Sequence, residues 1–394
     1  MLKQKRKLNK LKVRRCLIIF VAILILIISI ICIKINKEKN RYKELTILFN
    51  NEFIELINKP LIDNKNIFIS KDDIQKLFDS TIYYNEAEKE LITTYNTHIA
   101  LLKVDEQYAE INDETIELKG KLQEIDDKIY IPITDLAKVY DLEIVYSQKS
   151  NRIIIDSTLN EKIEAKILKK TKVESKKGFF GKKIDSVIIG DVVTVIGTEG
   201  KYKKIRTSLG NIGYIKENKI SDEKKIREDL KNEKDVLEVY RNYSNISGIY
   251  DNFDVDKNKL NVVVPTFFYL EKNSKVLDKT TSTTATYAIY KSWTEINQLE
   301  ILPTFTNNES VSNNLLSYSE RSFVINALKD YLIKYNYIGI NIEFDAIDDI
   351  NSFYRFILEL APRFKDAGLK VAVTLNNNLE KDRLEGIVDY ILEE

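Results

Sequence analysis

The chain has 394 residues, 44% of them hydrophobic, which is enough for two or three domains with ordinary apolar cores. Its formal net charge of +1 hides an asymmetry, because residues 1–15 carry eight Lys or Arg and no acid, while the remainder carries 53 basic and 60 acidic residues. A mildly acidic body argues against nucleic acid as the main partner, since phosphate binding needs a clustered basic face.

Residue types that often carry nucleophilic or metal chemistry are scarce. Cys16 and Cys32 are the only cysteines and lie in one apolar stretch, and His98 is the only histidine. The chain beyond that stretch therefore offers no disulfide framework, thiol nucleophile, Ser-His-Asp triad or two-histidine metal site. We expect His98 to be a surface or hydrogen-bonded residue, no metal or cofactor to be bound, and any catalysis to use carboxylates, tyrosines and amides.

An apolar stretch follows the basic residues 1–15. Residues 16–33 carry no charge and are dominated by Ile and Leu, so they approach the length needed to cross the ~30 Å core of a bilayer. We predict a transmembrane helix over residues 16–35, with a buried core helix as the alternative. Lys34 follows directly where a cleaved signal peptide would have small residues. The basic residues 1–15 then predict a cytoplasmic amino terminus, an extracellular body and a single-pass location in the cell membrane.

An internal duplication follows. Residues 44–57 have helical spacing and predict a stalk helix before Pro60. The apolar positions of residues 67–84 then recur 62 positions later, in residues 129–146. Each copy predicts a strand, a short helix and a second strand, and we expect the two copies to pack around one core. This pattern, over residues 60–157, resembles the small α+β domain named for the amino-terminal region of copper amine oxidases, a spacer in bacterial surface proteins. The name implies no copper here, because histidine ligands are lacking.

Residues 162–220 change to short β-type runs broken by glycine, which predict a small barrel. The order Gly190-Asp191, then Gly200 to Arg206, then Gly210 to Ile215 resembles bacterial SH3 domains. That resemblance implies attachment to the cell wall through aromatics such as Tyr202 and Tyr214, and a passive spacer is the alternative. Residues 221–240 are rich in charge and predict a solvated helical connector.

The region 241–394 alternates predicted strands and helices, and its central strand is the run from 337 to 347. Side chains of a strand alternate between its faces, so Ile340, Ile342, Phe344 and Ala346 share one face while Asn341, Glu343 and Asp345 share the other. Within a parallel βαβ array both faces are normally covered. Two carboxylates buried side by side would raise at least one pKa, as general-acid chemistry requires. An edge strand with its polar face in water is the alternative.

These residues carry a resemblance. The run Gly339-Ile340-Asn341-Ile342-Glu343-Phe344-Asp345 resembles the fourth strand of family 18 glycoside hydrolases, the chitinase-like (β/α)8 barrels, in their spore and cell-wall branch. The resemblance implies that Asp345 stands where the family has its acid/base Glu, and Glu343 where it has the Asp that orients the N-acetyl group. Asn341 would contact the substrate. The two carboxylates are present but exchanged in length.

The strands before and after this run extend the resemblance to a partial barrel. Residues 260–268, 299–305 and 369–375 would be further barrel strands, and residues 387–392 would open a sixth. A complete barrel takes about 250 residues, more than the region 241–394 provides. We therefore expect a carboxyl-terminally incomplete barrel, possible completion by a second chain, and a packing role for Trp293.

The sequence thus predicts a multidomain protein with a transmembrane helix, a duplicated α+β domain, an SH3-like barrel and a partial (β/α)8 barrel. Two functions stay open at this point. One is a membrane-anchored glycosidase acting on peptidoglycan or another N-acetylhexosamine polymer. The other is a non-catalytic surface protein that binds cell-wall glycan.

Overall fold

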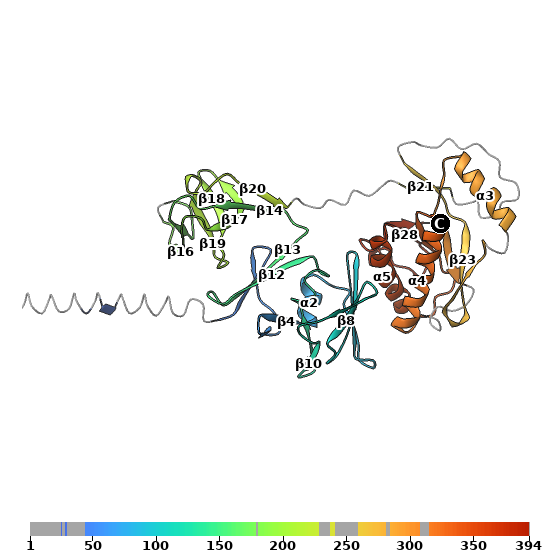
Figure 1. Cartoon of the computed structure of the whole chain (residues 1–394), viewed down its shortest axis with the longest axis horizontal. Helices are drawn as coiled ribbons and strands as arrows, with labels where there is room; N and C mark the ends of the chain where they lie inside the picture. The colour runs from blue at the N-terminus through green and yellow to red at the C-terminus, as the bar shows by residue number, and fades with distance from the viewer. Residues whose placement is uncertain are drawn as a thin grey trace, which may run out of the picture. The chain divides into compact units, whose positions relative to one another are not determined.

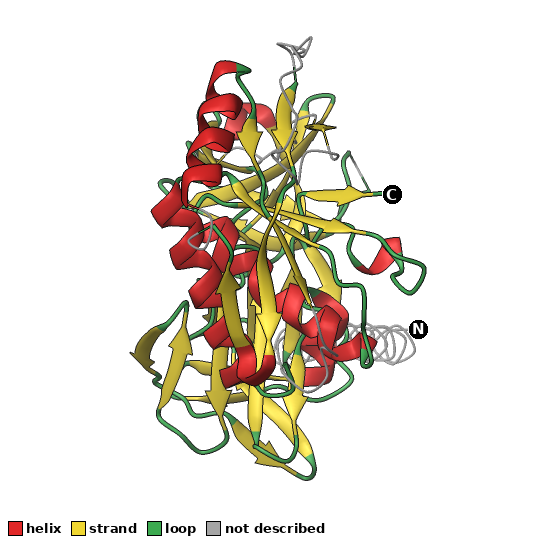
Figure 2. Cartoon of the chain, turned by 90° about the vertical axis from the view of Figure 1, so that its right-hand side faces the viewer, coloured by secondary structure: helices red, strands yellow, loops and turns green. Residues whose placement is uncertain are grey.

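The computed structural model describes residues 25, 28–29, 44–178, 180–227, 237–240, 259–280, 284–307 and 315–393. Strands predominate over helices in this part of the chain (Figure 1, Figure 2). The chain divides into two compact units, one formed by residues 1–56 with 141–230 and one by residues 57–140 with 231–394. Each unit is therefore assembled from two separate stretches of sequence.

The first unit contains two sheets. The strands of the smaller sheet are β1 (Thr46–Phe49), β2 (Glu52–Ile54), β12 (Leu142–Ser147) and β13 (Arg152–Ser157). Those of the larger sheet are β14 (Lys162–Lys166), β15 (Thr171–Glu174), β16 (Lys183–Val187), β17 (Val192–Glu199), β18 (Tyr202–Arg206), β19 (Ile212–Lys216) and β20 (Lys224–Arg227), with the short helix η1 (Glu217–Lys219) after β19. Arg206 joins the two sheets by donating from Nη1 to the Asp156 carboxylate at 2.7 Å.

The strands β1 and β2 correct the predicted stalk helix over residues 44–57. Asn50 and Asn51 have φ angles of 45° and 71°, a left-handed conformation that asparagine tolerates in tight turns. The chain therefore reverses, and β1 pairs in parallel with β13 and antiparallel with β2. Pairing with a strand about a hundred residues away outweighs the local helical spacing, as tertiary context often does. The predicted domain start at residue 60 leaves these two strands out.

The first stretch of the second unit holds two more sheets. One has the order β10-β11-β4-β3 and the other the order β5-β6-β7-β8-β9. Their elements are β3 (Leu61–Asp63), β4 (Asn66–Ser70), α2 (Lys71–Leu77), β5 (Tyr83–Asn85), β6 (Glu90–Tyr95), β7 (His98–Lys103), β8 (Tyr108–Ile111), β9 (Glu114–Glu117), β10 (Gln123–Ile125) and β11 (Lys128–Pro132).

The two copies of the duplication meet through their first strands, because β4 pairs antiparallel with β11. Their second elements differ. In the first copy Ser70 caps α2, accepting a hydrogen bond from the backbone N–H of Asp73 at 3.2 Å. In the second copy Pro132 offers no such side-chain oxygen, and the predicted short helix is a series of turns. The predicted helix of the second copy is therefore wrong.

The second stretch of this unit is a βα array. Its elements are β21 (Leu237–Tyr240), β22 (Leu260–Val263), β23 (Thr266–Glu271), η2 (Lys272–Ser274), β24 (Lys275–Asp278), α3 (Thr284–Ile296), β25 (Glu300–Ile301), β26 (Thr304–Asn307), α4 (Tyr318–Tyr335), β27 (Gly339–Ile342), α5 (Ile350–Asp366), β28 (Lys370–Thr374), η5 (Lys381–Arg383) and β29 (Tyr390–Leu392). The strands β23, β26, β27, β28 and β29 are neighbours in chain order, and all four pairings are parallel. The strand β24 adds an antiparallel edge.

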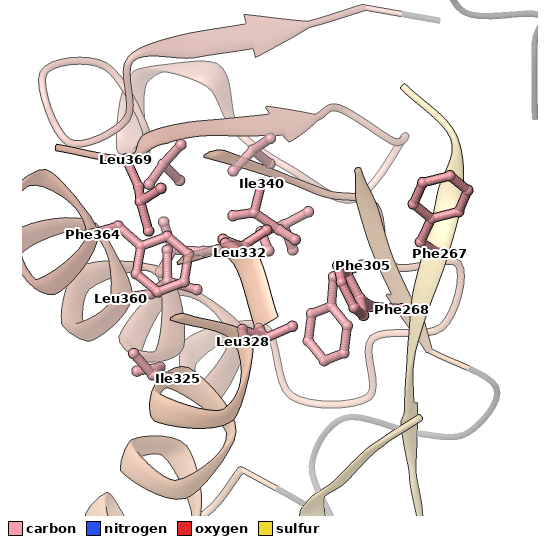
Figure 3. Packing of buried hydrophobic residues seen from close by; sticks show 14 of the residues in the cluster. Phe267, Phe268, Phe305, Ile325, Leu328, Leu332, Ile340, Leu360, Phe364 and Leu369 are labelled. Carbon is pink, nitrogen blue, oxygen red and sulfur yellow. The ribbon is translucent and has the colours of Figure 1, made fainter. Parts of the chain in front are cut away.

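Each face of this array carries an apolar cluster. On one face, side chains of α4 and α5 such as Leu328 and Phe364 point toward strand residues such as Phe305 and Ile340 (Figure 3). Trp293 of α3 is buried in the same cluster, in agreement with the packing role expected from the sequence. The other face carries a smaller cluster of Val262, Val264, Leu302, Ala372 and Leu392. The alternation places successive residues of each strand in opposite clusters.

Two further expectations need correction. The predicted helical connector over residues 221–240 contains the strands β20 and β21 where it is described, and residues 228–236 lie outside the described residues. The predicted transmembrane helix, residues 16–35, also lies outside them apart from Ile25, Ile28 and Ser29. None of the helices in the described ranges is long and apolar enough to cross a membrane, and the longest, α4, carries five charged residues. The structure therefore contradicts the predicted transmembrane helix and the predicted single-pass location in the cell membrane.

The helices α4 and α5 are joined by a buried ion pair. Arg321 donates from Nε and Nη2 to the two carboxylate oxygens of Glu359, each at 2.8 Å, and both side chains are almost completely buried. Arg321 also donates from Nη1 to the carbonyl oxygens of Leu315 and Leu316. Burial raises the pKa of Glu359, and the hydrogen bonds from Arg321 oppose that rise.

We predict that Arg321→Ala lowers the free energy of unfolding by about 3–5 kcal/mol at neutral pH, because it leaves a buried carboxylate without its partner. A carboxyl group whose pKa is raised in the folded state lowers the free energy of unfolding once the pH rises through that pKa. Loss of Arg321 raises the pKa of Glu359 further, because the hydrogen bonds that oppose the effect of burial are removed. The loss should therefore shrink in mild acid, where Glu359 takes up a proton. Urea unfolding followed by the fluorescence of Trp293, the single tryptophan, measures this unit.

The control for this prediction is Lys381→Ala, which breaks an exposed pair with Glu393 at 3.0 Å. Exposed pairs contribute about 0–1 kcal/mol, so this variant should unfold almost like the parent. Equal losses in the two variants, or a loss in Arg321→Ala that does not depend on pH, would contradict the prediction.

Candidate functional site

The strand β27 carries one polar side chain, that of Asn341, near its carboxyl end. Ile340 and Ile342 lie in the large apolar cluster, and Asn341 between them points to the opposite face. Parallel pairing sets Asn341 opposite Thr304 of β26 and Ala372 of β28. The sequence thus predicted the alternation of these faces correctly. The carboxyl ends of the strands are where βα arrays place their ligand sites.

Asn341 is the centre of a buried hydrogen-bond network. Its Nδ2 donates to Thr304 Oγ1 at 3.0 Å and to Glu343 Oε2 at 3.3 Å, and its Oδ1 accepts from Thr374 Oγ1 at 3.1 Å. Thr304, Asn341 and Thr374 come from three neighbouring strands and are all buried. A polar row at this depth persists because its members satisfy one another, and it fixes the rotamer of Asn341.

The structure places the two predicted carboxylates differently from the expected buried pair. The strand β27 ends at Ile342, so Glu343 and Asp345 follow it instead of lying within it. Glu343 is half-buried, its backbone N–H donates to Phe305 O at 3.0 Å, and its carboxylate accepts from Asn341. Asp345 is exposed in a bend. The carboxylates share a region at the end of the strand, with Glu343 held in the network and Asp345 open to solvent.

Two asparagines that sequence reasoning missed hold the segment that carries these carboxylates. Asn307, at the end of β26, donates from Nδ2 to Ala346 O at 2.5 Å and accepts from Ala346 N at 3.4 Å. Asn376, just after β28, donates from Nδ2 to Phe344 O at 2.9 Å. Asn307 is the last residue of β26, and Asn376 comes two residues after β28. A polar residue at the carboxyl end of a strand was therefore the sequence signal for both. Together they replace the ladder hydrogen bonds that end with β27.

A second group of polar side chains in the array, at the start of β27, is structural in character. Tyr337 donates from its hydroxyl to that of Tyr287 at 2.7 Å, and Tyr335 donates to Asp278 at 2.8 Å. Burial is the main cause that raises the pKa of both Tyr337 and Tyr287. These rings pack edge to face or tilted against one another and against Phe267. They form part of the core and lack the open position that a substrate needs.

No metal centre can be built from the described part of the chain, which contains no group of three His, Cys, Asp or Glu side chains placed to hold an ion. His98 begins β7 and its Nδ1 lies 3.4 Å from Thr97 Oγ1.

The two aromatic residues predicted to attach the chain to the cell wall, Tyr202 and Tyr214, lie in the seven-stranded sheet and are half-buried. Tyr214 donates a hydrogen bond from its hydroxyl to Glu199 at 2.8 Å.

Comparison with known proteins gives one family match. The model of the copper amine oxidase N-terminal domain matches residues 48–155. The match includes β2 and the last two residues of β1 as well as both copies of the duplication, and it covers well under half of the chain. No curated protein matches the chain.

Solved structures that resemble the chain at low similarity include several chitinases. A class V chitinase from Pseudomonas fluorescens Pf-5 is 14% identical with a TM-score of 0.31, over 34% of this chain and 46% of that one. The Group IV chitinase of Ostrinia furnacalis is 20% identical with a TM-score of 0.33, over 41% and 51%. A chitinase from Chromobacterium violaceum is 19% identical with a TM-score of 0.29, over 34% and 47%. The chain spans about half the length of these proteins.

We predict that Asn307→Ala and Asn376→Ala each speed amide hydrogen exchange in residues 344–348 by about two- to tenfold, because each removes side-chain hydrogen bonds to that backbone. Mass spectrometry of peptides from this segment measures the effect. Asn377→Ala, which truncates an exposed neighbour, is the matched control. Exchange that stays at the control value in both asparagine variants would show that neither residue holds the segment.

Proposed function

We propose that the βα array of residues 259–393 binds an N-acetylhexosamine polymer, such as peptidoglycan or a chitin-like chain, at the carboxyl ends of β26, β27 and β28. The observation that carries the proposal is the buried polar row of Thr304, Asn341 and Thr374, whose side chains are joined by hydrogen bonds. Asn341 also donates to Glu343, and the exposed Asp345 follows two residues later. The resemblance of residues 339–345 to family 18 glycoside hydrolases supplies the class of ligand.

Each side chain takes a stated role in this proposal. Asp345 is accessible to a ligand from solvent and stands at the family's acid position. Glu343 stands at the position that orients the acetamido group, and Asn341 fixes it through the 3.3 Å hydrogen bond. Asn307 and Asn376 position the segment between them. In this family the acetamido oxygen of the substrate attacks the anomeric carbon while the acid protonates the leaving oxygen.

Binding is favoured over hydrolysis by two features of these carboxylates. Asp345 is shorter than Glu by one methylene, and a misplacement of about 1 Å can cost on the order of 10²-fold in rate. Glu343 is longer than the Asp it stands for, and it is already engaged with Asn341. Hydrolysis is the second candidate function, and it is supported by the exposure of Asp345. The wall-attachment roles of Tyr202 and Tyr214 remain predictions.

Binding is tested by titration calorimetry of the full chain with the hexamer of N-acetylglucosamine. We expect Asn341→Ala and Glu343→Gln each to weaken binding by about tenfold, the loss expected when a hydrogen-bonded polar contact is removed. Asp366→Asn makes a similar charge change at the far end of α5 and is the matched control. The parent failing to bind, or all three variants binding equally, would refute the proposed site.

Hydrolysis is tested on the same hexamer by product analysis. We expect little or no turnover by the parent and a rise in the double variant Glu343→Asp/Asp345→Glu, which restores the reach of the acid and makes room for the acetamido group. High turnover by the parent that Asp345→Asn abolishes would instead establish hydrolysis as the function. Background turnover in every variant, with binding intact, would favour the non-catalytic function.

A further inference from the structure

We propose that the β15–β16 hairpin of the first unit binds an acidic polysaccharide along a basic track, which we define as Lys169, Lys170, Lys172, Lys176, Lys182 and Lys183. All six side chains are exposed. They lie just before β15, within it, past its end and at the start of β16. This surface is distinct from the carboxyl ends of β26, β27 and β28, and it uses a different kind of contact.

The hairpin lies within residues 162–220, whose net charge is positive while that of the rest of the chain is negative. Residues 162–220 carry 15 Lys or Arg against six Asp or Glu, whereas the rest of the chain carries 46 against 54. Within the described residues, the lysines of the basic track form no ion pair, while Lys177 beside them binds Glu199 at 2.9 Å. Uncompensated positive charge gathered on one hairpin attracts an anionic partner and is screened by salt.

An apolar residue lies at the turn of the same hairpin. Phe180 is 86% exposed, in the run Lys176-Lys177-Gly178-Phe179-Phe180-Gly181-Lys182-Lys183, where lysines flank the aromatic residues on both sides. The exposed ring adds apolar area beside the lysines of the basic track. An aromatic ring packs against the apolar face of a sugar ring, and the flanking lysines pair with acidic groups on neighbouring sugars.

The layout of the track favours an elongated ligand. Lys169 and Lys170 precede β15, and Lys176 and Phe180 follow it. At about 3.3 Å per residue, the four residues of β15 separate Lys170 from the turn of the hairpin by about 13 Å. A flat bilayer that meets Phe180 at the turn reaches only that end of the hairpin. A linear polymer can follow the whole track.

The choice of a polysaccharide over a nucleic acid rests on the proposed function, because a glycan-binding array in the same chain makes a glycan the expected partner for both surfaces. The experiment below is designed so that the two proposals fail separately.

The test measures binding of the full chain to fluorescently labelled alginate, a linear polysaccharide with a carboxylate on each sugar, at several salt concentrations. We expect binding that weakens with salt, absence of binding to neutral dextran, and a loss of about tenfold or more in the triple variant Lys172→Ser/Lys176→Ser/Lys182→Ser. Phe180→Ser should weaken binding with an unchanged salt dependence. The matched control is Lys76→Ser/Lys121→Ser/Lys128→Ser, which removes three exposed lysines of the second unit and should bind like the parent.

Several outcomes would overturn the inference. They are no binding to alginate, equal binding to dextran, or equal losses in the two triple variants. Tighter binding to oligothymidine or to phosphatidylglycerol-containing vesicles than to alginate would assign the track to a different partner. Titration with the N-acetylglucosamine hexamer separates the proposals, since the track variant should bind it like the parent even if the alginate result is negative.

Discussion

The parallel pairing of β26, β27 and β28 is the constraint on which the candidate site depends. It sets Thr304, Asn341 and Thr374 side by side on one face while Phe305, Ile340 and Ile342 enter the core on the other. A slip by one residue would exchange the two faces, so the apolar cluster and the polar row fix the register together. The helices α4 and α5 hold the apolar face in place, and their buried ion pair opposes any separation between them.

The polar row also accounts for the different surroundings of the two carboxylates. Glu343 remains tied to Asn341, which orients it and limits its freedom to contact a ligand. Asp345 lies beyond the last ladder pairing, on a segment that depends on Asn307 and Asn376 for its position. A site with one anchored and one exposed carboxylate suits recognition of a polar ligand, and it differs from the buried pair that the sequence led us to expect.

The two proposed binding surfaces use different physical forces. The array offers directed hydrogen bonds from buried side chains, which give specificity through geometry. The β15–β16 hairpin offers exposed positive charge, whose attraction salt weakens, together with the exposed apolar ring of Phe180. In the proposals above, a long acidic glycan contacts the hairpin and an N-acetylhexosamine chain contacts the array.

The sequence by itself determined the alternation of Ile340, Asn341 and Ile342, because a period of two fixes which face of a strand is apolar. It could not place the end of β27 or the exposure of Asp345, since these depend on hydrogen bonds from Asn307 and Asn376, which lie more than thirty residues from the groups they hold. The hairpin of β1 and β2 is a second case, where pairing with β13 outweighed helical spacing. Local spacing encodes the apolar face of an element, whereas the partners that end or redirect it come from distant parts of the chain and are decided by the tertiary structure.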